Sequence, residues 1–366
     1  PDYVHTFLDS LENLGYKGLE IVPPVARKNT SKIREEKPLN SNYQYFKWEY
    51  ERHWYLYQIF GRLSFNPHTT GEVLIRNFHR RFGEKGNQLA EIYSLAGKVL
   101  PLYVGVHINK EDPSNWPETE VGGLLEYYLR VPPGDPSLFS SFEEYTNSIL
   151  SGTKIAKISP LYITKYFKDL GTKILEKIKA IEDYLPRGDE DNIKEWQTLL
   201  IDFSILGNFS LYHSRKFKAA HELSLFYKTK DLHSLNQAII FLKKARTCWE
   251  KIITLTNQAY QQRLYTEPGI SPIHWSKKII LLLEDEKRLN LLKEEYLKRT
   301  NFLLGFDFGS PPSKLDKAKT NIFPDFYVEM GFIQVDHLSK YNLETGFGWQ
   351  IINGLQSISS PPIRLN

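Results

Sequence analysis

The sequence predicts a mainly α-helical fold, a bundle-like multi-helix domain with a short helix–strand remnant before it and a few β-strands after it. Residues 142–300 carry apolar side chains at helical spacing almost throughout. Short links rich in Pro, Gly and Asp join the stretches, so neighbouring helices should run antiparallel. The long stretches are 160–184, 191–227, 232–263 and 273–299. After Thr300, short segments alternate apolar and polar residues, which predicts strands.

These changes of pattern divide the chain into three regions. Residues 1–45 hold a helix, a strand and a polar loop, 46–303 the helical domain with a long loop at 105–141, and 304–366 the β segments. One helix and one strand cannot form a domain, because a strand needs sheet partners. The first region therefore indicates the end of an α/β barrel, with an edge strand docked on the helices as the alternative. The last region indicates the start of a β-sandwich module.

The first helix is expected over residues 1–15 and the first strand over 19–24. Gly15 suits the C-cap of that helix, and the two prolines of LEIVPP end the strand. The apolar residues at helical spacing are Val4, Phe7, Leu8, Leu11 and Leu14.

An unusually aromatic helix follows, from Trp48 to about Phe60. We expect it to close on a Gly61–Leu63 turn, with Asn66-Pro67 as the break before the next helix. Its aromatic residues are Trp48, Tyr50, Trp54, Tyr55, Tyr57 and Phe60. They point nearly all round the helix, whereas anchoring to a core needs one face. The helix is therefore either deeply wrapped by protein or part of a surface that stacks flat, apolar ligand faces.

Two more helices should precede the long loop. Thr69 or Thr70 can cap the first, and the second is expected over 86–104. Loop 105–141 is rich in Pro, Gly and Asp and also holds Trp116. A loop of this length inside a compact domain is usually functional or disordered, and large apolar side chains argue against disorder.

Composition excludes several classes of protein. The chain has 366 residues with 47 basic and 43 acidic side chains, a balance that argues against a nucleic-acid partner. We find no apolar run long enough to span a bilayer, so no membrane partner is expected. Aromatic residues reach 14%, as in proteins that stack on sugars or in an aromatic core. The single cysteine, Cys248, lies in a helical pattern and is expected to be a small buried side chain.

Motifs for metals and cofactors are missing from the sequence. It has no HExxH, no CxxC, no GxGxxG, no P-loop and no GxSxG. GGLLEYY, at 122–128, lacks the Lys and Ser/Thr of a phosphate-binding loop. We therefore expect neither a metal nor a cofactor.

The segment WYLYQIFGRLSFNP, at 54–67, resembles the region that follows the catalytic barrel in α-glucuronidases and related barrel glycoside hydrolases. In that family a large helical domain comes next, and GYKGLEIVPP before the segment looks like a last barrel strand. The resemblance places the acid and base carboxylates on earlier barrel strands, and no position here matches them.

The C-terminal region shows a second resemblance. FDFGS, GFIQV and GFGW are similar to the start of galactose-binding-like (malectin-like) modules of bacterial polysaccharide-degrading enzymes. The two resemblances together imply a piece of a secreted enzyme. Its parent protein would be periplasmic or extracellular, although this chain shows no signal peptide.

Seven residues are candidates for carbohydrate contacts: Glu20, Trp48, Arg52, Trp116, Glu118, His274 and Trp275. Glu20 lies near the C-terminal end of its strand, the functional face of a barrel, or simply faces solvent. Arg52 can bind a uronic-acid carboxylate with both guanidinium nitrogens, or it can pair with Glu49 within the helix or pack on an aromatic ring. Trp116 and Glu118 can meet a ligand from the loop, or Trp116 can pin the loop to the body. His274 begins a helix and should be neutral and hydrogen-bonded.

The leading hypothesis is the helical part of a polysaccharide-degrading glycoside hydrolase, which shapes a carbohydrate cleft without supplying the catalytic carboxylates. Whether the chain is itself an enzyme stays open. The alternatives are a non-enzymatic carbohydrate-binding protein and a helical scaffold.

Overall fold

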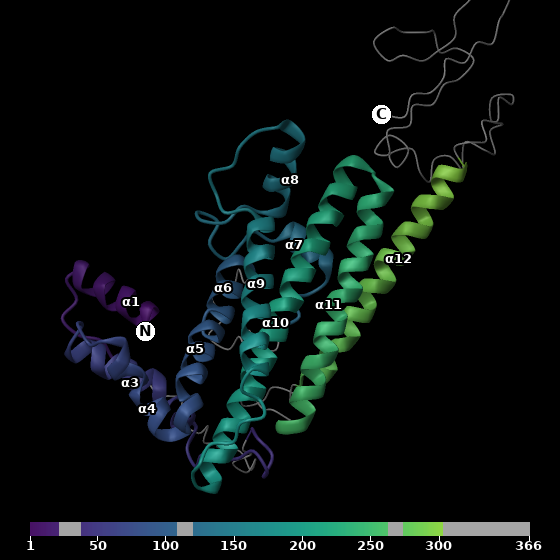
Figure 1. Cartoon of the computed structure of the whole chain (residues 1–366). Helices are drawn as coiled ribbons and strands as arrows, with labels where there is room; N and C mark the ends of the chain where they lie inside the picture. Colours follow the sequence, from purple (N-terminus) through teal and green to yellow (C-terminus); the bar gives the residue numbers. More distant parts are fainter. Residues whose placement is uncertain (22–37, 108–119, 263–273, 303–366) are drawn as a thin grey trace, which may run out of the picture. The chain divides into compact units, whose positions relative to one another are not determined.

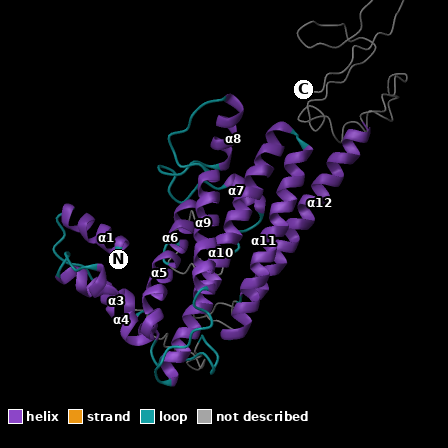
Figure 2. Ribbon diagram, viewed as in Figure 1, coloured by secondary structure: helices purple, strands orange, loops and turns teal. Residues whose placement is uncertain are grey.

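The computed structural model describes residues 1–21, 38–107, 120–262 and 274–302. Over these residues the fold is mainly α-helical, as the sequence predicts, and contains no named strand (Figure 2). Residues Pro1–Glu295 form one compact unit, and Tyr296–Asn366 form a second. The predicted β segments at 304–366 lie outside the described residues, so that part of the domain division stays a prediction.

The centre of the first unit is the 40-residue helix α10 (Glu190–Thr229), which packs against α9 (Pro160–Lys179) and α11 (Leu232–Ala259) (Figure 1). Lys230 adopts a left-handed conformation with φ 57°, and the chain then reverses into α11. Asp231 caps α11 by accepting hydrogen bonds from the backbone N–H groups of the first turn. The predicted long helices are thus confirmed, as is the short link between α10 and α11, whereas residues 263–273 before the last long helix lie outside the described residues.

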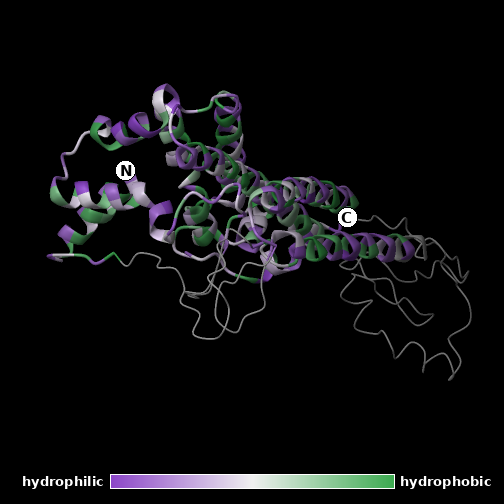
Figure 3. Ribbon diagram, turned by 90° about the horizontal axis from the view of Figure 1, so that it is seen from below, coloured by the Kyte–Doolittle hydropathy of each residue, from purple (hydrophilic) through white to green (hydrophobic). Residues whose placement is uncertain are grey.

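Hydrophobic and hydrophilic residues are interleaved along the helices (Figure 3). The buried residues of α9 form one stripe, whereas those of the central helix α10 lie on most of its sides. Large side chains from all three helices fill the interface between them. They include Phe167, Ile174, Trp196, Phe209, Leu242 and Trp249. Cys248 is a free thiol within this core, as expected.

The N-terminal helix α1 (Asp2–Asn13) forms where the sequence predicts it. Its Phe7 ring meets Phe60 of α3 (Trp54–Phe65) edge to face, with 6.0 Å between centroids. The strand expected over 19–24 is not formed at 19–21, its described part, where the backbone has no regular structure. No described segment pairs with these residues, and an unpaired strand leaves its backbone groups unsatisfied.

The aromatic helix is divided in two. A single turn, α2 (Glu49–Arg52), is followed at His53 by α3. The turn expected at Gly61–Leu63 is wrong, because α3 continues through it to Phe65. Tyr55, Ile59 and Leu63 are all buried at four-residue spacing, so the core stripe carries the helix past Gly61. Asn66 then ends the helix before Pro67, as predicted.

Shorter helices connect this region to α9. The helix expected over 86–104 forms but is divided at Gly97, and loop 105–141 contains a short helix that the sequence did not predict. The elements are α4 (Gly71–Phe82), η1 (Gly83–Lys85), α5 (Gly86–Ala96), α6 (Val99–His107), α7 (Leu125–Arg130) and α8 (Phe142–Ser151). Thr70 precedes α4 as predicted, without a side-chain capping bond. After α11, η3 (Trp275–Lys278) leads into α12 (Ile279–Phe302).

One helical run, Gly71–His107, is apolar and long enough to cross a membrane by length and composition, with a window of mean hydropathy 1.3. The expectation that no such run exists is wrong by this measure. The run contains α5, which packs on α9 and α10. Its buried members include Leu89, Ile92, Ala96, Val99 and Tyr103. Part of its apolar character therefore belongs to the core of the helical unit, since 39% of the apolar window is buried.

Candidate functional site

Arg52 joins three elements that are far apart in sequence. Its Nη2 lies 2.6 Å from Asp202 Oδ2 on α10 and also donates to the hydroxyl of Tyr260. Tyr260 in turn donates to Asp202 Oδ1 at 2.5 Å. The side chains of Arg52 and Asp202 are each 16% exposed. Burial raises the pKa of Tyr260 well above its ordinary value, so this hydroxyl keeps its proton.

A second arginine–carboxylate contact lies two turns earlier on the same face of α10. Glu195 is 1% exposed, accepts from Trp54 Nε1 at 2.7 Å, and is held by Arg81. The Arg81 guanidinium also covers the Trp54 ring at 4.9 Å. Burial raises the pKa of Glu195, while Arg81 opposes the rise.

These two carboxylates do not form an open catalytic pair. Seven residues separate Glu195 and Asp202, a rise of roughly 10 Å along the helix. That is at or beyond the largest separation that glycoside hydrolysis uses, about 5–10 Å. Protein donors also occupy both carboxylates. The arrangement fastens the N-terminal helices to α10.

We expect the Arg52–Asp202 pair to contribute to stability as a coupled unit. Arg52→Ala should lower the free energy of unfolding by about 1–3 kcal/mol, because Asp202 loses a charged donor in a mostly buried place. A double-mutant cycle with Asp202→Asn, measured by urea unfolding, should give a coupling free energy of about 1 kcal/mol. Strictly additive losses would contradict a direct pair.

Near this cluster two aromatic rings remain open to solvent. Trp48 is 41% exposed and Tyr50 is 43% exposed. Glu51 Oε2 accepts from the backbone N–H groups of Lys47 and Trp48, which fixes the entry to α2. The Lys47 ammonium lies 5.3 Å from the centre of the Trp48 ring. An exposed indole with a cation beside it can stack on an apolar ring face that carries a negative group.

The other predicted contacts have different environments. Glu20 is exposed and belongs to no strand, while Trp116 and Glu118 lie outside the described residues. His274 and Trp275 are 1% and 4% exposed, so they are core residues. Burial lowers the pKa of His274, whose Nδ1 accepts from the N–H of Ser276, so it is neutral and hydrogen-bonded as expected.

Of the seven candidates, the structure brings Arg52 and Trp275 together through Tyr260. The Trp275 ring lies 5.2 Å from the Tyr260 ring, and the Trp275 carbonyl accepts from Trp249 Nε1. The Arg52 guanidinium packs on the same Tyr260 ring, 5.6 Å from its centroid. Trp275 thus braces the side chain that Arg52 binds and offers no open ring to a ligand.

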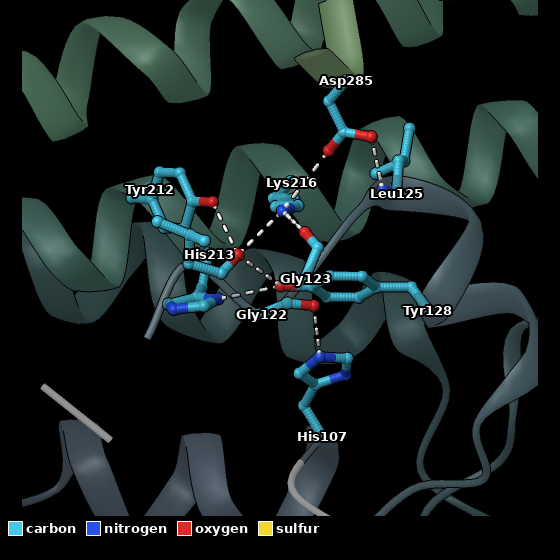
Figure 4. A network of polar contacts seen from close by, with 10 residues as sticks. His107, Gly122, Gly123, Leu125, Tyr128, Tyr212, His213, Lys216 and Asp285 are labelled. Carbon is cyan, nitrogen blue, oxygen red and sulfur yellow. Dashed lines mark hydrogen bonds and ion pairs between the residues drawn. The ribbon is translucent and has the colours of Figure 1, made fainter. Parts of the chain in front are cut away.

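Sequence analysis missed a second polar network, which centres on Lys216 (Figure 4). Lys216 is fully buried, donates from Nζ to the carbonyls of Val121 and Gly123, and lies 3.5 Å from Asp285 Oδ2. Asp285 Oδ1 accepts from the N–H of Leu125 at 2.7 Å. Burial lowers the pKa of Lys216 to about 8 and raises that of Asp285, while each charge opposes the shift of the other.

The Gly122-Gly123 pair makes this network possible. Both residues have positive φ, 77° and 73°, so the carbonyls of this turn can converge on Lys216. A Cβ on Gly122 would lie 2.0 Å from the Tyr128 hydroxyl. Gly122 O also meets His107 Nε2 at 3.0 Å. The motif therefore ties the segment before α7 to α10 and α12.

A signal for the buried lysine was present in the sequence. Lys216 stands at helical spacing between Tyr212 and Ala219, both of which are buried. Among the residues that the structure describes, no group of three or more His, Cys, Asp or Glu side chains is placed to hold a metal ion.

Comparison with known proteins gives a structural relationship. No family model matches the sequence, and no curated protein does. A solved structure with a similar fold is described as a GH138 enzyme targeting pectin rhamnogalacturonan II. The TM-score is 0.65 at 14% identity, and the match covers 81% of this chain and 45% of that one. The fold of this chain is thus similar to part of that enzyme, and the match spans less than half of the enzyme's length.

Proposed function

We propose that this chain is the helical part of a polysaccharide-degrading glycoside hydrolase, and that it supports and shapes a carbohydrate cleft without the catalytic carboxylates. The observation that carries the proposal is the fold match over 81% of the chain to an enzyme that targets a pectin. Arginines hold both Glu195 and Asp202, so these two carboxylates do not form the free pair that hydrolysis needs.

In this proposal the open rings of Trp48 and Tyr50 meet the sugar. Stacking uses the apolar face of a pyranose ring, and Lys47 adds a positive charge for a uronic-acid carboxylate. We also propose that the parent enzyme is α-glucuronidase-like and that residues 304–366 begin a malectin-like module. A polysaccharide substrate would place the parent protein in the periplasm or outside the cell.

Binding of oligosaccharides tests the proposal. Trp48→Ala should weaken binding of rhamnogalacturonan II or oligogalacturonate fragments about fivefold, since an aromatic contact is worth about 1 kcal/mol. Isothermal titration calorimetry measures the affinity. Tyr162→Ala is the matched control, because it removes a ring that is 59% exposed on α9. The chain alone should release no sugar from either substrate.

Equal affinity of the Trp48→Ala protein and the parent chain would reject the proposed contact. Absence of any carbohydrate binding would favour the second candidate, a helical scaffold. A specific observation motivates that candidate, because much of the aromatic content lies in the core. Trp196, Trp249 and Trp275 are all buried. Sugar release by this chain alone would contradict the absence of catalytic carboxylates.

A further inference from the structure

The outer side of the α10–α11 contact carries a group of basic side chains, which we call the seam cluster: Arg215, Lys218, Lys244 and Lys251. Arg215 Nη1 donates to the carbonyl of Lys244 at 2.8 Å, which holds the two helices together. The ammonium groups of Lys218 and Lys244 lie 6.0 Å and 5.3 Å from the centre of the Phe241 ring. Lys251 continues the same face of α11, two turns beyond Lys244.

Negative charge is scarce around this cluster. Glu222 lies 2.8 Å from Lys218, and its side chain is 12% exposed. Glu250 is turned to another side of α11, where it pairs with Arg246. Lys244 and Lys251 are exposed, and no carboxylate of the described residues lies within ion-pair distance of either. The whole chain is nearly balanced in charge, so this local excess is not a consequence of composition.

The shape of the cluster fits an extended anion better than a compact one. Lys244 and Lys251 are roughly 10 Å apart along α11 by helical rise, so one small anion cannot bridge them closely. Phe241 lies under two of the cations, and Ile240, 42% exposed, adds apolar surface beside them. Charges at intervals together with apolar patches match a chain of sugar rings that bears carboxylates.

We propose that the seam cluster binds an acidic polysaccharide, a uronate-containing chain, at a site separate from Trp48 and Arg52. This inference rests on the proposed function, since it assumes a carbohydrate ligand. Arg215 lies 13 residues beyond Asp202, which is roughly 20 Å along α10. The same 13 residues also turn the helix by roughly 140°, so the seam cluster faces a different side of α10 from Asp202 and would hold a part of the polysaccharide that lies outside the cleft.

Charge reversal tests the site. Lys244→Glu/Lys251→Glu should weaken oligogalacturonate binding about tenfold and should make it less sensitive to salt, because fewer charges are left to screen. The matched control, Lys165→Glu/Lys173→Glu, makes the same change in net charge on the exposed face of α9 and should alter affinity less than twofold. Binding of a neutral galactan should not change in either variant. Thermal unfolding of each variant checks that the fold is intact.

Three outcomes would overturn the inference. They are unchanged oligogalacturonate affinity in the Lys244→Glu/Lys251→Glu protein, an equal loss in the α9 control, and binding of DNA or heparin as tight as binding of oligogalacturonate. Equally tight binding of DNA or heparin would mean that the seam cluster binds polyanions in general. The Trp48→Ala protein shows whether only the seam-cluster inference is wrong or the proposed function is wrong as well. Loss in Trp48→Ala with no loss in the seam variant rejects the seam cluster alone, whereas no carbohydrate binding by the parent chain rejects both.

Discussion

Lys216→Ala is expected to lower the free energy of unfolding by about 3–5 kcal/mol, because it leaves Asp285 as a buried charge without its cation. The carbonyls of Val121 and Gly123 lose their donor in the same step. An unsatisfied buried polar group carries a desolvation penalty of its own. Urea unfolding followed by circular dichroism measures the loss.

The control for this change is two residues away. Lys218 is on the surface of the same helix, with a side chain 28% exposed and an ion pair to Glu222. Lys218→Ala should lower the free energy of unfolding by about 0–1 kcal/mol. If Lys216→Ala is no more destabilising than Lys218→Ala, the network around Lys216 does not hold the fold.

The same lysine gives stability a distinctive pH dependence. Its pKa is about 8 in the folded chain and 10.5 ordinarily, so between these values the unfolded chain binds more protons. Stability linked to Lys216 should therefore rise as pH increases from about 8 towards 10.5. Burial raises the pKa values of Tyr128 and Tyr212, so these tyrosines lower the stability at high pH. They do so only where tyrosine in the unfolded chain ionises, near pH 10. Lys216→Met should lack the rise between pH 8 and 9.5, and a variant that keeps it would contradict the assignment.

Gly171→Val is expected to lower the free energy of unfolding by about 3 kcal/mol, because the backbones of α9 and α10 lie in close contact at this residue. A Cβ on Gly171 would lie 2.6 Å from the carbonyl oxygen of Gly207 and 2.9 Å from Leu211 Cγ. The carbonyl belongs to the helix backbone and cannot rotate away, so the two helices would have to separate. Overpacking of this kind usually carries a penalty of about 1–3 kcal/mol, and the β-branch adds to it.

Gly61 is the control position for the substitutions at Gly171. It also lies inside a helix, but a Cβ there would meet nothing within 4 Å. Gly61→Ala should raise the free energy of unfolding by about 0.5–1 kcal/mol through helix propensity alone. Gly171→Ala should instead be destabilising. Opposite signs for the two alanine variants, measured by urea unfolding, establish the close approach, and two equal gains would contradict it.

The helices could be predicted from local pattern because their apolar residues recur with the helical period. The four long helices, the end of α3 before Pro67 and the cap position before α4 needed no knowledge of distant contacts. Errors arose where packing overrode a local signal. Gly61 is a typical helix breaker, yet the buried stripe that includes Leu63 carries α3 through it.

The candidate site was predicted less well, because exposure depends on what packs against a side chain. Trp48 and Trp275 carry the same chemical signal in the sequence, but one ring is 41% exposed and the other 4%. Local reasoning offered Arg52 a neighbour on its own helix, an aromatic ring or a ligand, and could not say which ring or which carboxylate. Its observed partners, Asp202 and Tyr260, are 150 and 208 residues away along the chain.

The sequence by itself determined the helical class, the order and extent of the long helices, and the aromatic richness, since these depend on residue type and spacing. Only the tertiary structure decided which charges are buried and what they bind. Lys216 reaches its partners because α10, α12 and the turn at Gly122-Gly123 meet at one place. The seam cluster likewise exists only where α10 and α11 lie side by side. Coulomb energy and desolvation depend on distance in space, and periodicity along a chain carries no information about that distance.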